Sequence, residues 1–259
     1  SLPVDAQASV DKMLQQKQGL ISSCGREQVH LEDVLRLTPG QWLNDEIINF
    51  YGAMVMERAE RWHRGDFSDI GFSPSNSNPH VDWDINRKRQ HGDPLQVHYF
   101  NTFFYSKLSS SGYEKARLNK WTKKVDIFAK DALLIPINLG NSHWTFACIN
   151  LRRKRIEYFD SLGRCRSSVY EILRDYLDKE HIDKKKIGFS FDGWRDYFST
   201  DTPQQENAFD CGVFMCQFME AASRGEEVED FAFRQENMPY LRRRMLWEIR
   251  QSRLISWKV

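Results

Sequence analysis

Cys211 is the residue in this sequence best placed to act as a nucleophile. A polar loop ends at Asp210, and apolar residues at helical spacing follow the cysteine: Phe214, Phe218 and Ala222. The pattern predicts a helix that starts at Cys211, with Asp210 as its N-cap. Unpaired amide groups and the positive end of the helix dipole favour a thiolate there, and the thiolate is the form that attacks a carbonyl carbon. A lone cysteine is more often a small buried side chain, so this hypothesis requires a base.

His143 and Asp160 are the base and the orienting carboxylate that we predict for this nucleophile. Residues 144–149 and 155–159 are rich in aromatic and β-branched side chains, and a polar stretch separates them, which predicts a β-hairpin. Folding the hairpin brings the start of its first strand opposite the end of its second, so His143 and Asp160 become cross-strand neighbours. A carboxylate beside a histidine fixes its tautomer and stabilises the imidazolium that forms when the ring takes a thiol proton. Either residue alone fits a structural role; their joint position predicts catalysis.

Gln205 is a candidate donor for an oxyanion hole. It lies shortly before Cys211, so a compact loop can turn its side-chain amide toward the carbonyl oxygen that the Cys211 N–H would face. Without those partners, a glutamine in such a loop is a solvated or turn-forming residue.

The chain order His, Asp, Gln, Cys, with the sequences around these residues, closely resembles the Ulp/SENP family of SUMO-specific cysteine proteases. The order differs from that of papain-like enzymes, in which the cysteine precedes the histidine. Further blocks also look like this family and extend the resemblance over about residues 20–255: WLNDEIINFY at 42–51, FNTFF at 100–104, WTKKVD at 121–126 and MPY at 238–240. The resemblance implies an α+β fold with papain-like cysteine protease architecture, in which helices flank a central mixed sheet and the nucleophile lies at a helix N-terminus.

The resemblance also implies a substrate. Family members cleave after the Gly-Gly tail of a SUMO-type modifier, so SUMO and SUMO-conjugated proteins are the expected partners, and no cofactor is needed. Trp42 and Trp144 match the tryptophans that clamp the tail, and two indole faces can enclose a backbone only where the substrate has no β-carbon. Asp45 and Lys120 match the modifier-facing surface, where charges set orientation and partner choice. Nuclear residence is expected on the same resemblance.

Two alternatives stay open. In the first alternative to a SUMO protease, the chain is a related protease for another ubiquitin-like modifier. In the second, it is a module that binds a modifier without cleaving it. All four catalytic residue types are present, which argues against the second alternative.

Composition sets broader limits. The sequence has 259 residues and a formal net charge of +1, so nothing demands a nucleic-acid or membrane partner. It has no continuous apolar span of membrane length, and we expect a soluble intracellular monomer. Its five cysteines are odd in number and form no CxxC pair, which argues against a disulfide framework and a zinc site. His63, His80, His91 and His98 lack metal-ligand spacing, so we predict no metal.

One catalytic domain is predicted over residues 21–259, after an N-terminal extension at 1–20 with a weak helical pattern. Residues 64–95, rich in Gly, Pro, Asn and Ser, predict a loop insertion that contains a basic triplet at 87–89.

Several helices and a strand are expected around these features. A helix begins after Asn44 as N-cap and ends near Arg61, a second covers residues 113–121, and a buried strand covers 133–137. A further helix is capped by Ser167 or Ser168. The last begins at Pro239, and its basic run at 242–244 is expected on a solvated face.

Overall fold

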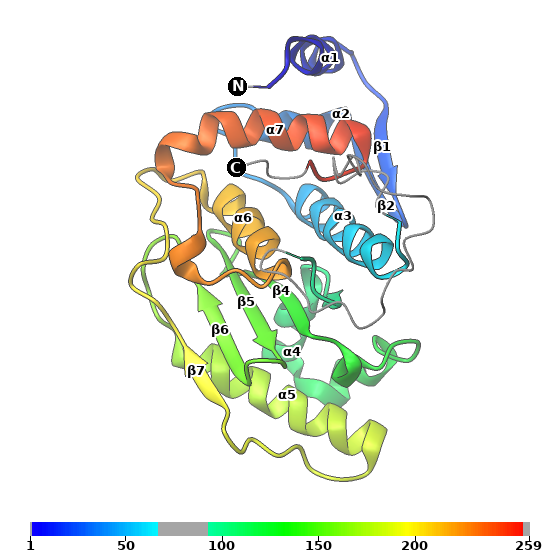
Figure 1. The fold of residues 1–259 in the computed structure, drawn as a ribbon, viewed down its shortest axis with the longest axis vertical. Helices are drawn as coiled ribbons and strands as arrows, with labels where there is room; N and C mark the ends of the chain where they lie inside the picture. The colour runs from blue at the N-terminus through cyan, green and yellow to red at the C-terminus, as the bar shows by residue number, and fades with distance from the viewer. Residues whose placement is uncertain (1, 67–92, 256–259) are drawn as a thin grey trace, which may run out of the picture.

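The computed structural model describes residues 2–66 and 93–255. Most of the predicted insertion at 64–95, including its basic triplet, lies outside the described residues. The α-helices, labelled in Figure 1, are α1 Val4–Leu14, α2 Leu31–Val34, α3 Asp45–His63, α4 Phe103–Lys115, α5 Ser167–Lys185, α6 Cys211–Ser223 and α7 Met238–Gln251. The strands are β1 Leu20–Cys24, β2 Glu27–His30, β3 Val97–Tyr99, β4 Ala132–Asn138, β5 Trp144–Asn150, β6 Arg155–Phe159 and β7 Arg195–Tyr197. Short 3-10 turns are η1 Leu35–Leu37, η2 Leu118–Lys120, η3 Ile127–Ala129, η4 Val228–Asp230 and η5 Gln235–Asn237.

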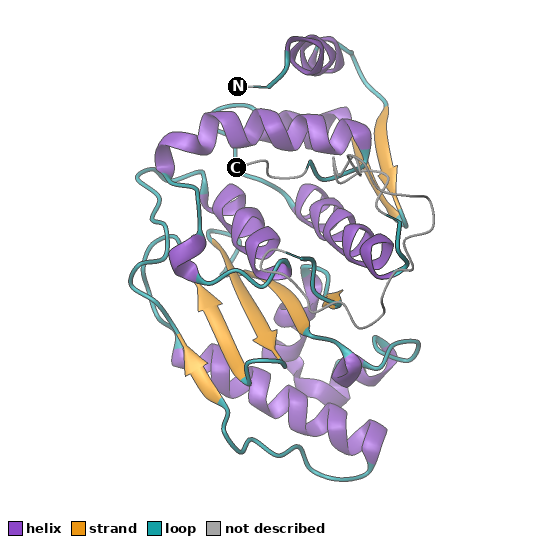
Figure 2. Ribbon diagram, in the orientation of Figure 1, coloured by secondary structure: helices purple, strands orange, loops and turns teal. Residues whose placement is uncertain are grey.

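The main sheet is mixed, with five strands in the order β3-β4-β5-β6-β7. Strand β5 pairs antiparallel with both β4 and β6, whereas the outer strands β3 and β7 run parallel to their neighbours. Strands β1 and β2 form a separate antiparallel pair. Figure 2 shows helices around this sheet. The arrangement confirms the α+β fold with a central mixed sheet, and the predicted hairpin is the β5–β6 pair.

The two faces of the sheet are covered by different helices. Because successive strand residues point to opposite faces, Leu134 and Phe146 join the core formed with α3, α6 and α7, while Leu133 and Ala147 join the core formed with α4 and α5. Burial on both faces explains why β4 is a continuous apolar run, as predicted for residues 133–137. The sheet is therefore a rigid support whose strand ends can present side chains at a fixed spacing.

Helix α3 agrees closely with its prediction. The Asn44 side chain accepts a hydrogen bond from the Ile47 N–H at 3.2 Å and so caps the first turn. The predicted inward stripe is buried, and the helix ends at His63, near the expected Arg61.

Helix α1 lies inside the segment predicted as an N-terminal extension. Its residues Ala6, Val10 and Met13 are buried, and the helix packs on α7. The Arg243 guanidinium donates a hydrogen bond to the Asp11 carboxylate at 2.7 Å. The segment is therefore docked on α7, although the domain boundary at residue 20 stays a prediction.

Two helix predictions are wrong in detail. The helix expected over residues 113–121 instead covers Phe103–Lys115, with a kink at Gly112, where φ is 73°. It cannot continue to Trp121, because Arg117 takes a left-handed conformation at φ 53°. Ser167 is the first residue of α5 and not its cap. The N-cap position belongs to Arg166, whose side chain makes no capping bond.

The basic run of α7 was expected on a solvated face, and that prediction is wrong for two of its three residues. Arg242 and Arg244 are buried, and each pairs with a buried carboxylate, Asp210 and Glu248 respectively. Paired and hydrogen-bonded arginines can be buried where unpaired ones cannot. Arg243 alone is partly exposed.

Candidate active site

The candidate nucleophile is the first residue of a wholly buried helix. Helix α6 begins at Cys211, as predicted, and all of its side chains are buried, including the cysteine at 2% exposure. Asp210 occupies the predicted N-cap position, but its side chain makes no capping bond. Its carboxylate instead accepts hydrogen bonds from Arg242, Asn207 and Gln235. The amide groups of the first helical turn thus have no competing carboxylate cap.

Gly212 allows the segment before α3 to approach this helix end. A β-carbon at Gly212 would lie 2.9 Å from the Cβ atom of Leu43, closer than real β-carbons come. Leu43 in turn follows Trp42, so the residue after the candidate nucleophile contacts the residue after a predicted clamp tryptophan. The glycine is required here by close packing.

His143 and Asp160 meet as the sequence predicts, although the hairpin geometry differs. The His143 Nε2 atom lies 2.6 Å from the Asp160 Oδ1 atom. The strand register pairs Phe146 with Phe159, so its continuation would place Thr145, not His143, opposite Asp160. The contact is therefore diagonal, which long side chains can span. The turn occupies the predicted polar stretch at residues 151–154, and the strand pairing is centred between Arg152 and Arg153.

A second bond fixes the carboxylate. The Leu162 N–H donates to the same Asp160 Oδ1 atom at 2.8 Å, and Asp160 is fully buried. A held carboxylate sets the orientation of the imidazole. Since Asp160 takes Nε2, Nδ1 is the ring nitrogen left for the cysteine.

The charge state of His143 suits a thiolate partner. Burial lowers the pKa of His143, but hydrogen bonds to Asp160 and Cys211 and attraction to both groups outweigh burial and raise the pKa to about 9. The ring is therefore an imidazolium at neutral pH. Cys211 is one of the two groups that raise the pKa of His143, so the ring and the sulfur act on each other, as nucleophilic catalysis by a thiol requires.

Gln205 lies in a loop that is tied to the end of β6. Its Oε1 atom accepts a hydrogen bond from the Ser161 hydroxyl at 2.6 Å, and its main-chain N–H donates to the Ser161 main-chain oxygen at 2.8 Å. Its Nε2 atom donates to the Asn207 main-chain oxygen at 2.5 Å. An amide has two such hydrogens, so this bond uses one of them. Ser161 had no predicted role; its place directly after Asp160 was the only signal.

The two predicted clamp residues differ in exposure. Trp42 is 38% exposed, whereas Trp144 is 4% exposed and donates from Nε1 to the Leu43 main-chain oxygen at 3.0 Å. Trp144 begins β5 directly after His143, so the sheet positions the indole and the candidate base together. The Trp144 bond ties that strand to the segment that carries Trp42.

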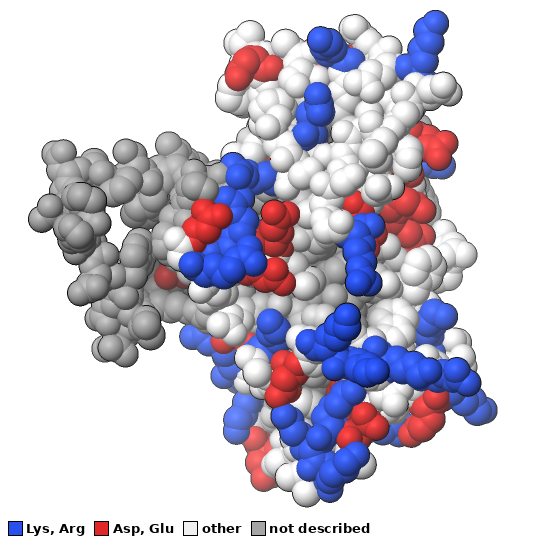
Figure 3. Space-filling model, turned by 90° about the vertical axis from the view of Figure 1, so that its right-hand side faces the viewer, with Lys and Arg blue, Asp and Glu red and all other residues white. Residues whose placement is uncertain are grey.

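Asp45 and Lys120 lie on other elements than the triad residues. Asp45 is the first residue of α3, partly exposed, and Lys120 is exposed at the end of η2. Residues 115–124 contain no acidic residue and expose Lys115, Arg117, Lys120, Lys123 and Lys124. Figure 3 shows Lys and Arg side chains gathering on the lower part of one face. Lys120 thus belongs to a basic stretch.

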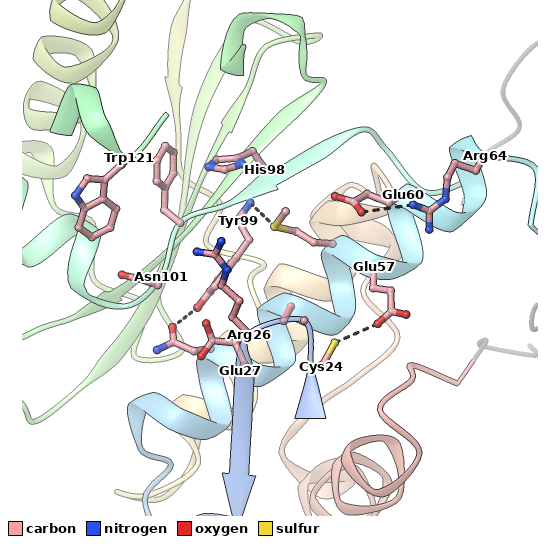
Figure 4. Close-up of a pocket in the computed structure, with 15 residues that line it drawn as sticks. Cys24, Arg26, Glu27, Glu57, Glu60, Arg64, His98, Tyr99, Asn101 and Trp121 are labelled. Atoms are coloured by element: carbon pink, nitrogen blue, oxygen red, sulfur yellow. Dashed lines mark hydrogen bonds and ion pairs between the residues drawn. The ribbon is translucent and has the colours of Figure 1, made fainter. Parts of the chain in front are cut away.

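A separate cavity of about 580 Å³ contains another cysteine and histidine (Figure 4). It lies between α3, the β1–β2 hairpin and the segment after β3. Cys24 donates to the Glu57 carboxylate at 3.2 Å, and burial and this bond raise the pKa of Cys24 to about 12. Burial lowers the pKa of His98 to about 4. A thiol and an imidazole that both stay neutral near pH 7 form no ion pair, so this cavity is a poorer candidate for thiol catalysis than the site at His143.

The remaining cysteines are either buried thiols or, for Cys165, a thiol beside the Tyr170 hydroxyl at 4.0 Å. Cys148 and Cys216 are fully buried, and burial raises the pKa of each. Cys165 is exposed. Within residues 2–66 and 93–255, no group of three or more His, Cys, Asp or Glu side chains is arranged to hold a metal ion. None of the helices described there is long and apolar enough to cross a membrane.

Comparison with known proteins identifies the family. Residues 83–254 match the Ulp1 protease family, C-terminal catalytic domain. A sentrin-specific protease of Caenorhabditis elegans is 41% identical over 229 residues, which are 88% of this chain and 28% of that protein. Ubiquitin-like-specific protease 1A of Arabidopsis thaliana is 35% identical over 221 residues, 83% of this chain and 38% of that protein. This chain therefore spans about a third of the length of these relatives.

A solved structure has the same fold over nearly all of the chain. The C-terminal Ulp1 protease domain, determined in complex with Smt3, the yeast ortholog of SUMO, matches with a TM-score of 0.70 and 27% identity. The match covers 97% of this chain and 96% of that one.

Proposed function

Because this chain belongs to the Ulp1 protease family, we propose that it is a cysteine protease that cleaves after the C-terminal Gly-Gly of SUMO. The observation that carries the proposal is the His143–Asp160 pair at 2.6 Å beside Cys211 at the start of α6. Nucleophile, base and orienting carboxylate are the parts that thiol acyl transfer needs.

The reaction proceeds by acyl transfer to sulfur. The Cys211 thiolate, held against the His143 imidazolium, attacks the carbonyl carbon of the terminal glycine. His143 then gives its proton to the departing amine, which is a lysine side chain in a conjugate or an α-amine in a precursor. The resulting thioester is hydrolysed by water that His143 activates, which restores the thiolate and the imidazolium.

The oxyanion of the tetrahedral intermediate is stabilised by Gln205 and the Cys211 N–H. The amide hydrogen of Gln205 that is not bonded to Asn207 supplies one bond, and the first turn of α6 supplies the other. The hydrogen bond from the Ser161 hydroxyl holds the Gln205 amide in place before substrate arrives, so little reorganisation is needed during reaction.

The diglycine tail lies between Trp42 and Trp144. Support comes from the Trp144–Leu43 bond, which fixes the two indoles on adjoining segments. A passage between two ring faces admits residues without side chains and excludes bulkier ones. Asp45 and the basic stretch around Lys120 contact the body of the modifier and set its orientation. Nuclear residence stays a prediction, which the distribution of a fluorescent fusion in cells would test.

The experiment is covalent capture with modifiers whose C-terminal glycine carries a vinyl sulfone or an aldehyde. We expect SUMO probes to label wild-type protein at Cys211 and to leave Cys211→Ala unlabelled. Cys165→Ala is the matched control, because it removes an exposed thiol and should keep full labelling. Labelling by a non-SUMO modifier alone would instead establish the related protease with another substrate. SUMO binding with unchanged conjugate cleavage in Cys211→Ala would reject the nucleophile.

A further inference from the structure

Arg242 is a buried arginine that connects the two segments bordering the candidate active site. It lies on α7 and is 2% exposed. Its Nε atom donates to the Asp210 Oδ1 atom at 2.8 Å, directly before Cys211 in the chain. One terminal nitrogen donates to the Gln41 oxygen at 2.8 Å, directly before Trp42. A single side chain therefore touches the neighbours of both the nucleophile and a clamp residue.

Every N–H of this guanidinium has an acceptor. Besides Asp210 and Gln41, the group donates to three main-chain oxygens, those of Arg36 at 3.0 Å, Thr38 at 3.2 Å and Phe209 at 3.2 Å. A guanidinium has five donors in a fixed planar arrangement, and here all five are used. Since main-chain oxygens accept most of these bonds, Arg242 fixes backbone positions and not merely a side-chain contact.

The Asp210 carboxylate continues the connection toward the oxyanion loop. Its Oδ2 atom accepts hydrogen bonds from Asn207 at 2.7 Å and from Gln235 at 2.9 Å. The Asn207 oxygen is the acceptor for the Gln205 amide, and the Gln235 side-chain oxygen accepts from the Glu206 N–H at 2.9 Å. The two residues that follow Gln205, Glu206 and Asn207, are thus held by groups bonded to Asp210.

We propose that Arg242 is a positioning residue for the reaction: acting through Asp210, it sets the spacing between the Trp42 segment, Cys211 and the Gln205 loop. The proposal rests on the proposed function for its substrate, but its geometry stands independently. Lysine would keep the charge pair with Asp210, yet one ammonium group has three donors and no planar array, so it cannot hold all these acceptors. The spacing would relax while the buried charge stayed paired.

The test compares Arg242→Lys with Arg244→Lys. Arg244 is a fair control because it lies on the same helix, is buried, and pairs with Glu248 and the Ile255 oxygen, not with the active-site segments. Both changes should lower thermal stability. With enzyme concentration fixed by active-site titration, we expect kcat on a SUMO conjugate to fall by about 10- to 100-fold for Arg242→Lys alone, because small misplacements of reacting groups cost that much. KM should change little.

A purely structural role predicts a different result. It would lower the titrated fraction of both variants and leave kcat per titrated site equal, and that outcome would overturn the proposal. If Arg242→Lys does not fold, Gln235→Ala tests the positioning role instead. Gln235 is only half-buried and belongs to the same hydrogen-bond network. We expect its kcat to fall by roughly 3- to 10-fold, and a wild-type kcat would contradict the inference.

A readout without any modifier separates this inference from the proposed function. Mass spectrometry of the peptide that contains Cys211 measures its alkylation by iodoacetamide, which needs no tail channel. We expect alkylation at pH 6 to slow by about 10-fold in Arg242→Lys relative to Arg244→Lys, since the sulfur leaves its place beside His143. If wild-type protein cleaves no SUMO substrate, the function fails, and this comparison still decides the role of Arg242.

Discussion

The Nε1 atom of Trp144 donates a hydrogen bond to the main-chain oxygen of Leu43 at 3.0 Å. This contact joins the strand that begins directly after His143 to the segment that carries Trp42. The Leu43 side chain also packs against Gly212, which follows Cys211. Leu43 therefore adjoins Trp42 in the chain and contacts the residues that follow His143 and Cys211. The site is therefore assembled around Leu43 as well as around its reacting groups.

Replacing Trp144 should separate the role of the ring from that of its N–H. Trp144→Phe keeps an aromatic face but leaves a buried oxygen unpaired, so we expect the free energy of unfolding to fall by about 1–3 kcal/mol. Trp144→Ala also removes a buried ring and should cost about 3–5 kcal/mol. Urea denaturation measures both losses. Turnover of the folded fraction should fall severely in Trp144→Ala and less in Trp144→Phe. Normal turnover in the alanine variant would show that Trp144 does not clamp the substrate tail.

Gly212→Ala should damage the helix start through a steric clash. Alanine favours a helix interior by about 1 kcal/mol over glycine, but overpacking typically costs about 1–3 kcal/mol, and the added β-carbon would lie 2.9 Å from the Leu43 Cβ atom. We therefore expect net destabilisation and slower cleavage. The double variant with Leu43→Gly removes that β-carbon and relieves the contact, so the two single-variant stability losses should add to more than the loss measured in the double variant. Strict additivity would show that the clash is unimportant.

Lys120→Glu should weaken capture of the modifier through electrostatics. The change puts a negative charge in a basic stretch that includes Lys123 and Lys124, and charges at an interface rim act mainly on the association rate. We expect KM to rise several-fold at low ionic strength with kcat unchanged. The difference should shrink at high salt, because exposed charges are screened. Lys186→Glu, an exposed change at the end of α5, is the control. A KM independent of salt would exclude the predicted surface role.

The sequence was sufficient for the parts of the site that depend on local pattern. Helix α6 follows from apolar spacing after Cys211, and the β5–β6 hairpin follows from two β-rich runs around a polar turn. Pairing of the two strands brings His143 close to Asp160. The predicted register was wrong, but the contact still forms, because a long side chain can reach a diagonal neighbour.

The parts that depend on distant packing could not be predicted. Asp210 has the residue type of an N-cap, and only the three-dimensional approach of α7 shows that Arg242 takes its carboxylate instead. A run of three arginines has the pattern of a solvated face, and no local signal distinguishes the two that are buried by ion pairs. Leu43 and Ser161 likewise gain their roles from contacts between segments far apart in sequence.

The pKa of His143 predicts how activity depends on pH. Since hydrogen bonds to Asp160 and Cys211 raise it from 6.5 to about 9 despite burial, the imidazolium persists through neutral pH and loses its proton near pH 9. The leaving amine then has no acid, so kcat should fall with rising pH around that value. The same sign holds for stability: a raised pKa stabilises the fold fully below about pH 6.5, and this contribution disappears as pH rises through about 9.

Asp160→Asn tests this assignment, because asparagine keeps the size of the side chain and removes its charge. The pKa of His143 should fall, so the alkaline decline in kcat should move to lower pH, and kcat at its optimum should drop by about 100-fold or more. Its stability deficit against wild-type protein, followed by urea denaturation, should narrow between pH 6 and pH 10, since the wild type loses its imidazolium there. An alkaline decline at the same pH in both proteins would mean that a group other than His143 delivers the proton.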